Sequence, residues 1–149
     1  MAKFNIKNLK QFEKSLDKRV IEGSEKELGR LIQRSVDLVK RTAVDSIASG
    51  GKSGRLYPRG NNPPHRASAA GEPPATDQGN LAGGISTKVT KKSNEITGQV
   101  LTNSDGHSEY GVHLEFGTKN ILPRPFMQPA LERNRPRIRR IFKDGGYIK

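Results

Sequence analysis

A stripe of apolar residues that begins after residue 24 restricts the fold of this chain more than any other feature. The stripe recurs at three- and four-residue steps, as one face of an α-helix does, through Leu28, Leu31, Ile32, Val36, Val39, Ala43 and Ile47. Ser24 and Glu27 match a capping box after the interruption at Gly23, and Gly50 and Gly51 follow its end. The pattern predicts a long amphipathic helix whose apolar face packs against something broad, most plausibly one face of a sheet.

A shorter helical pattern precedes this stripe, with Leu9, Phe12 and Leu16 spaced at three- and four-residue steps. Residues 1–49 are therefore predicted to be helical. The first residues have no apolar run behind their charges, and no segment reaches the roughly 18 apolar residues of a membrane span. We expect a soluble protein without a signal peptide or a membrane partner.

The composition allows one domain with a thin core. The 149 residues are only 32% hydrophobic and include 16 Gly and 9 Pro, which suits long polar connections or a fold completed by neighbouring subunits. There is no cysteine, which excludes disulfides, thiolate metal sites and cysteine nucleophiles.

Residues 50–80 break every period and are predicted to form one extended loop. Paired prolines keep such a loop extended, and Arg55, Arg59 and Arg66 make it cationic. A loop near thirty residues long is usually functional or disordered until bound. We expect this one to be disordered in the free monomer and ordered in an assembly.

Residues 81–103 predict an antiparallel β-hairpin with one face in water. Its strands are Ile85–Thr90 and Ile96–Thr102, both rich in β-branched residues, and a polar turn joins them. The fold class predicted from these elements is α+β, with the long helix on a small antiparallel sheet.

Residues 107–149 are predicted to hold a short helix or strand, a turn and a basic closing helix. Gly117 suits a positive-φ stop, and Pro125 suits a helix start. Pro136 should kink the last helix or begin a new one.

The sequence contains no recognisable catalytic or metal-binding motif, so no catalytic residue, metal site or cofactor is expected. His107, Glu109 and His113 have neither zinc-finger nor His-Glu-x-x-His spacing. Ser104, Asp105 and His107 lack the context of a nucleophile elbow. We expect a protein that is not an enzyme.

The formal net charge of +12 favours a polyanionic or acidic partner. The basic residues are densest near the end of the chain, where the candidates for polyanion contact are Arg133, Arg135, Arg137, Arg139 and Arg140. These arginines could neutralise phosphates without reading sequence, or could pair with carboxylates on a neighbouring protein.

Two segments together resemble the tail-completion, or head–tail joining, proteins of long-tailed bacteriophages. The first is Ser68-Ala-Ala-Gly-Glu-Pro-Pro-Ala75, followed by Gly79-Asn-Leu81 and a strand. The second is Tyr110, then Leu114-Glu-Phe-Gly-Thr118, Arg124-Pro-Phe126 and Pro129-Ala-Leu131. The resemblance covers roughly residues 66–132, about half of the chain, and ends before the arginine-rich segment.

The resemblance implies a single head–tail joining domain over residues 1–149. It implies a structural virion protein of the neck or upper tail, made in the host cytoplasm and forming a ring that is commonly sixfold. The implied partners are the connector or stopper, the tail terminator and the tail tube, with DNA in the channel close by. The alternatives are a tail terminator or minor tail protein, or a basic protein that binds nucleic acid non-specifically.

The motif residues then receive roles as hypotheses. Tyr110, Leu114, Phe116, Phe126 and Pro129 are expected in the local core, with Gly117 reversing the backbone. Glu115 is expected to be solvated or paired with an arginine, either Arg124 or an adjacent subunit's Arg55 or Arg59. The subunit-interface candidates are Arg55, Arg59, Arg66, Glu72, Glu115 and Arg124.

Overall fold

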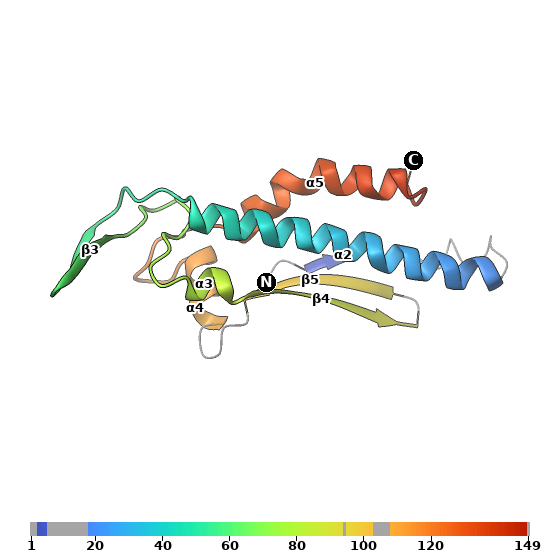
Figure 1. Cartoon of the computed structure of the whole chain (residues 1–149), viewed down its shortest axis with the longest axis horizontal. Helices are drawn as coiled ribbons and strands as arrows, with labels where there is room; N and C mark the ends of the chain where they lie inside the picture. Colours follow the sequence, from blue (N-terminus) through green and yellow to red (C-terminus); the bar gives the residue numbers. More distant parts are fainter. Residues whose placement is uncertain (1–2, 6–17, 94, 103–107, 149) are drawn as a thin grey trace.

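The computed structural model of the chain describes residues 3–5, 18–93, 95–102 and 108–148. It is an α+β fold with a long central helix, α2 (Lys18–Ala48). A small antiparallel sheet lies along one side of α2, and the closing helix α5 (Met127–Asp144) lies along another side (Figure 1). The predicted fold class is confirmed.

Helix α2 buries the predicted apolar stripe completely, because all seven of its residues are at most 5% exposed. The helix nevertheless begins at Lys18 and continues through Gly23 and Ser24, so the predicted start at the capping box is wrong. One glycine costs a helix only about 1 kcal/mol, which a long packed helix tolerates. Leu9, Phe12 and Leu16 lie outside the described residues.

The sheet has three strands in the order β1-β5-β4, and both neighbouring pairs are antiparallel. The predicted hairpin is confirmed as β4 (Ile85–Lys92) and β5 (Glu95–Thr102), with Ile85 opposite Thr102. The third strand, β1 (Lys3–Asn5), pairs with the outer edge of β5, so the prediction that residues 1–49 are all helical is wrong. Three residues are too few to show the two-residue period of a strand.

Gly98 on β5 brings the sheet into direct contact with α2. A Cβ atom at this position would lie 2.6 Å from both the Ile32 Cγ2 and the Val36 Cγ1 atoms. The helix therefore rests on the backbone of β5, with Ile96 and Val100 buried on either side of the glycine.

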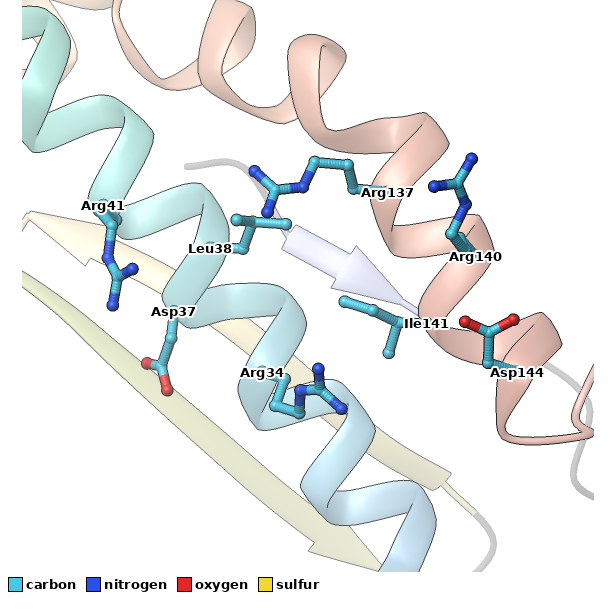
Figure 2. Close-up of a pocket in the computed structure, with 8 residues that line it drawn as sticks. All are labelled: Arg34, Asp37, Leu38, Arg41, Arg137, Arg140, Ile141 and Asp144. Atoms are coloured by element: carbon cyan, nitrogen blue, oxygen red, sulfur yellow. The ribbon is translucent and has the colours of Figure 1, made fainter.

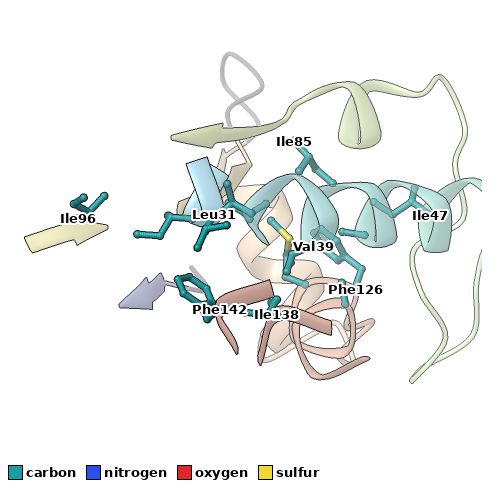
Figure 3. Packing of buried hydrophobic residues seen from close by; sticks show 14 of the residues in the cluster. Leu31, Val39, Ile47, Ile85, Ile96, Phe126, Ile138 and Phe142 are labelled. Carbon is teal, nitrogen blue, oxygen red and sulfur yellow. The ribbon is translucent and has the colours of Figure 1, made fainter. Parts of the chain in front are cut away.

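The core is one continuous cluster that α2 shares between the sheet and α5 (Figure 3). Helix α5 contributes Met127, Ala130, Ile138 and Phe142 to this cluster. A polar contact also ties the two helices together, because the buried Asn134 amide donates to the Thr42 Oγ1 atom at 2.8 Å. The thin core expected from composition is thus organised around a single helix.

Residues 54–67, called the arm below, form a β-hairpin where an extended loop was predicted. Its strands are β2 (Leu56–Arg59) and β3 (Asn62–Arg66), joined by a turn at Gly60 with a φ of +57°. The loop prediction over 50–80 is wrong here because both strands of a two-stranded ribbon are edges, where prolines are tolerated. The arm projects beyond the end of α2, as Figure 1 shows. Its expected ordering on assembly stays a prediction.

Three further helices complete the described chain. A single turn, α3 (Asn80–Gly83), precedes the sheet, and α4 (Ser108–Phe116) confirms the helical alternative for the Tyr110 segment. Helix α5 begins at Met127 rather than Pro125 and continues through Pro136, so a new helix does not begin there. No helix within the described ranges is long and apolar enough to cross a membrane.

Candidate functional site

The two segments that carry the phage resemblance meet in space, although residues 82–109 separate them in the chain. The Gly71 amide donates to the Pro123 carbonyl at 2.9 Å. The Arg124 amide in turn donates to the Leu114 carbonyl at 2.6 Å. We call this meeting point the motif junction, and it lies at the base of the arm.

Glu115 caps the first turn of α5. Its carboxylate is buried and accepts hydrogen bonds from three backbone amides, those of Phe126 at 2.8 Å, Met127 at 2.9 Å and Gln128 at 2.8 Å. A carboxylate at this position also faces the positive end of the helix dipole. The expectation that Glu115 is solvated is therefore wrong, and the carboxylate forms no salt bridge with Arg124 among the described residues. Its pairing with an arginine of an adjacent subunit stays a prediction.

Pro129 completes the same arrangement. The first four amides of an α-helix have no partner within the helix. Glu115 binds the first three of them, at Phe126, Met127 and Gln128, while Pro129 at the fourth position has no N–H to satisfy. Regular helical bonding then begins with the Ala130 amide and the Phe126 carbonyl. The Glu-Phe-Gly-Thr and Pro-Ala-Leu motifs are thus two parts of one helix start.

The turn between α4 and α5 confirms part of the expected local core. Leu114 and Phe126 are fully buried, and Gly117 has a φ of +75°. A Cβ atom on Gly117 would also lie 2.8 Å from the Ile121 carbonyl oxygen. Pro129 is half-buried.

Two other members of the expected core are on the surface instead. Phe116 is 64% exposed and Tyr110 is 50% exposed, so their assignment to the core is wrong. Phe116 follows the buried Leu114 by two positions, which turns it about 200° around the helix. Tyr110 stands in the first turn of α4 and lines a hollow of about 320 Å³ with Ile47 and Leu81.

Glu72 clamps the two ends of the arm together. Its carboxylate accepts hydrogen bonds from the hydroxyl and amide of Ser53, just before the arm, and from the Ala69 amide at 2.7 Å, just after it. Arg124 lies close enough for its charge to act on this carboxylate. The buried Nε atom of Arg124 has no hydrogen-bond partner among the described residues.

These contacts hold the pKa of Glu72 below its usual value. The Ser53 hydroxyl contributes most, followed by the Ala69 amide, while burial opposes them and the Arg124 charge adds a smaller effect. Because the pKa is lowered in the folded state, the clamp stabilises the arm fully above the unfolded pKa and is lost as the pH falls through the lowered folded-state pKa.

We expect Glu72→Gln to release the base of the arm at neutral pH. Amide hydrogen exchange should become faster at residues 53–69 and stay unchanged in α2. In the wild type the same acceleration should appear only on acidification through the lowered pKa. Equal exchange of these amides in the two proteins at pH 7 would show that the carboxylate does not hold the arm.

The arginines expected at a subunit interface lie in and beside the arm. Arg55 stacks over the Tyr57 ring at 5.5 Å, and Arg66 donates to the Gly54 carbonyl at 3.2 Å. Arg59 forms an ion pair with Asp77, a residue that the motif patterns did not single out. The arm makes no substantial contact with any other described helix or strand.

Two apolar surfaces stand out at the same end of the molecule. On the arm, Leu56 and Tyr57 are 47% and 46% exposed. On α4 and the turn after it, Val112, Phe116 and Leu122 are exposed, the last at 69%. We call the second set the α4 surface. Exposed apolar groups of this kind mark interaction sites more often than catalytic ones.

The expected polyanion contacts are all exposed along α5. They are Arg133, Arg135, Arg137, Arg139 and Arg140, of which Arg135 pairs with Glu132 at 2.7 Å. Two residues of α2, Arg34 and Arg41, lie beside Arg137 and Arg140, and sequence reasoning missed them. Their seven-residue spacing next to the apolar stripe was the available signal.

The described residues hold no cluster of three or more His, Asp or Glu side chains that could bind a metal ion. His107, Ser104 and Asp105 lie outside the described residues. His113 is exposed on α4, and the half-buried His65 lies 3.9 Å from Asp77. No protein-family model, curated protein or solved structure matches the chain.

Proposed function

We propose that this chain is a non-enzymatic structural protein of a long-tailed phage, acting in the neck or upper tail. There it completes the tail and joins it to the DNA-filled head. The observation that carries the proposal is the motif junction. Gly71 belongs to the first segment that resembles the head–tail joining family, and its amide donates a hydrogen bond to Pro123, the residue directly before Arg124 of the second segment, at the base of a projecting arm.

The arm supports an assembly role because it is poorly stabilised within its own subunit. A lone two-stranded hairpin is marginally stable in water. This one is held at its base by Glu72 and at its side by the Arg59–Asp77 pair, and it exposes Leu56 and Tyr57. A neighbouring surface that covered these two side chains would order the arm.

In the proposed assembly, the arm of one subunit docks on the α4 surface of the next copy. Donor and acceptor are then different faces, and such a heterologous contact closes into a ring when the rotation per subunit allows it. We propose a ring, sixfold in the particle, between the connector or stopper on one side and the tail terminator and tube on the other. The chain is then a virion component that is assembled in the host cytoplasm.

The proposal is tested by inactivating the gene in the phage that encodes this chain and imaging the lysate by electron microscopy. We expect DNA-filled heads and separate tails of normal length. A tail terminator, the nearest rival, controls where the tube stops, so its loss would change tail length instead. Infectious particles formed without the chain would contradict both readings.

A further inference from the structure

A groove of about 550 Å³ runs between α2 and α5 on the side of the molecule shown in Figure 2. Arginine side chains stand on both of its banks, Arg34 and Arg41 on α2 and Arg137 and Arg140 on α5. Leu38 and Ile141 also line it. The lining carries two carboxylates, so the arginines outnumber them by two to one.

These four arginines keep their charges available to a ligand because none of them is paired with a carboxylate among the described residues. By contrast, Arg30, Arg59 and Arg135 each pair with a carboxylate. The Asp37 Oδ1 atom accepts hydrogen bonds from the Gln33 side-chain amide at 2.9 Å and from the Thr87 hydroxyl on β4 at 3.1 Å. In Figure 2 the Asp37 carboxylate points toward the strands, away from α5. Asp144 remains as the one acidic group on the α5 bank.

We propose that this groove binds the phosphate backbone of duplex nucleic acid without reading its sequence. Unpaired guanidinium groups are strong hydrogen-bond donors to phosphate oxygens. When they neutralise phosphates, the counterions condensed on the nucleic acid are released, which favours binding at low salt. This binding goes beyond the proposed joining role and does not depend on it.

The length of the groove matches a short run of phosphates. Arg34 and Arg41 are seven residues apart on a helix, which separates them by about 10 Å. One strand of a duplex carries a phosphate about every 3.4 Å along the axis, so this length faces about three phosphates. Arg133 recurs four residues before Arg137 and extends the same face of α5 by one turn.

The lining favours nucleic acid over an acidic protein. A specific protein interface is usually anchored by large apolar or aromatic groups at its centre. Of the described residues that line the groove, only Leu38 and Ile141 are apolar, both are partly buried against the core, and none is aromatic. The absence of an aromatic platform also disfavours the base stacking by which proteins hold single strands.

The test measures binding of a fluorescent 20-base-pair duplex by anisotropy across a salt series. We expect micromolar affinity at about 50 mM salt for the wild type, falling steeply as salt increases. The double variant Arg137→Gln/Arg140→Gln should bind at least tenfold more weakly, and its slope of log affinity against log salt should be shallower by about two. The pair Arg34→Gln/Arg41→Gln on the other helix should behave alike.

The matched control is Arg139→Gln/Lys143→Gln. It removes the same charge from the same helix, at exposed positions that do not line the groove. We expect its affinity to stay within threefold of the wild type. Conversely, Asp144→Asn removes the acidic group of the α5 bank and should strengthen binding several-fold.

Three results would overturn the proposal. They are an absence of duplex binding at low salt, equal losses in the groove and control variants, and tighter groove-dependent binding of a poly-glutamate peptide than of the duplex. The last would assign the groove to an acidic protein segment. Far-UV circular dichroism of each variant checks that the exposed substitutions leave the fold intact.

Discussion

Replacing Glu115 by alanine is expected to lower the free energy of unfolding by about 3 kcal/mol. The change removes three hydrogen bonds from backbone amides to a buried carboxylate. A hydrogen bond to a charged group contributes a net stabilisation of about 1.5–3 kcal/mol, and the three bonds do not add in full because they share one carboxylate. Water cannot fully replace them, because Phe126 and Met127 are buried. Chemical denaturation of the purified protein gives the measurement.

The matched control for this variant is Glu109→Ala. Glu109 is an exposed carboxylate on the same helix, so its removal should change the unfolding free energy by less than about 0.5 kcal/mol. Amide exchange at Met127 and Gln128 should accelerate in Glu115→Ala and not in the control. A loss below about 1 kcal/mol for Glu115→Ala would contradict the capping role.

This result would also change the meaning of an assembly defect at Glu115. If Glu115 paired with an arginine of an adjacent subunit, Glu115→Gln would weaken oligomerisation and leave the isolated fold intact. The carboxylate is buried and already accepts three hydrogen bonds from the α5 amides, so the substitution should first weaken the isolated subunit. We expect any assembly defect of Glu115→Gln to follow from lost stability.

The double variant Leu56→Ser/Tyr57→Ser is expected to weaken association between copies by at least about 30-fold per contact. Covering a large apolar side chain contributes about 1.5–3 kcal/mol, and every 1.4 kcal/mol is a factor of ten in affinity. Both side chains are about half exposed on an arm that makes no substantial contact with another described element. Stability of the monomer should therefore change little.

Sedimentation velocity over a concentration series measures this effect. The control is Ile148→Ser, which removes an exposed apolar group in the segment after α5. Figure 1 shows this end of α5 well away from the arm. Phe116→Ser on the α4 surface should weaken association as the arm variant does. Unchanged association in both the arm and the α4 variants would exclude the proposed contact.

The sequence predicts the parts of the fold that rest on periodicity. The stripe from Leu28 to Ile47 and the alternation in β4 and β5 each repeat several times, so α2 and the hairpin were located correctly. The arm was missed because its strands are short and rich in proline, so that neither a period nor a propensity signals them. The start of α2 was placed too late because a glycine was read as a break.

The sequence singled out residues that belong to the candidate site, but the contacts predicted for them were wrong. Glu115 and Arg124 were singled out together as charges, yet the Glu115 carboxylate binds the α5 amides and forms no salt bridge with Arg124 among the described residues. The turn at Gly117 brings the Glu115 carboxylate to the first amides of α5, and residue types alone do not predict the path of the backbone through that turn. Phe116 was predicted to lie in the core together with Phe126. It is exposed because it stands two positions after the buried Leu114 and therefore on the opposite side of α4.

The central claim, that this chain joins phage heads to tails, is tested most directly by electron microscopy of lysates from a phage lacking the gene. The account predicts filled heads and free tails of normal length. Joining should return when wild-type protein is supplied, and should fail with Leu56→Ser/Tyr57→Ser. Complete infectious particles in the absence of the chain would contradict the account, and tails of altered length would point to a terminator instead.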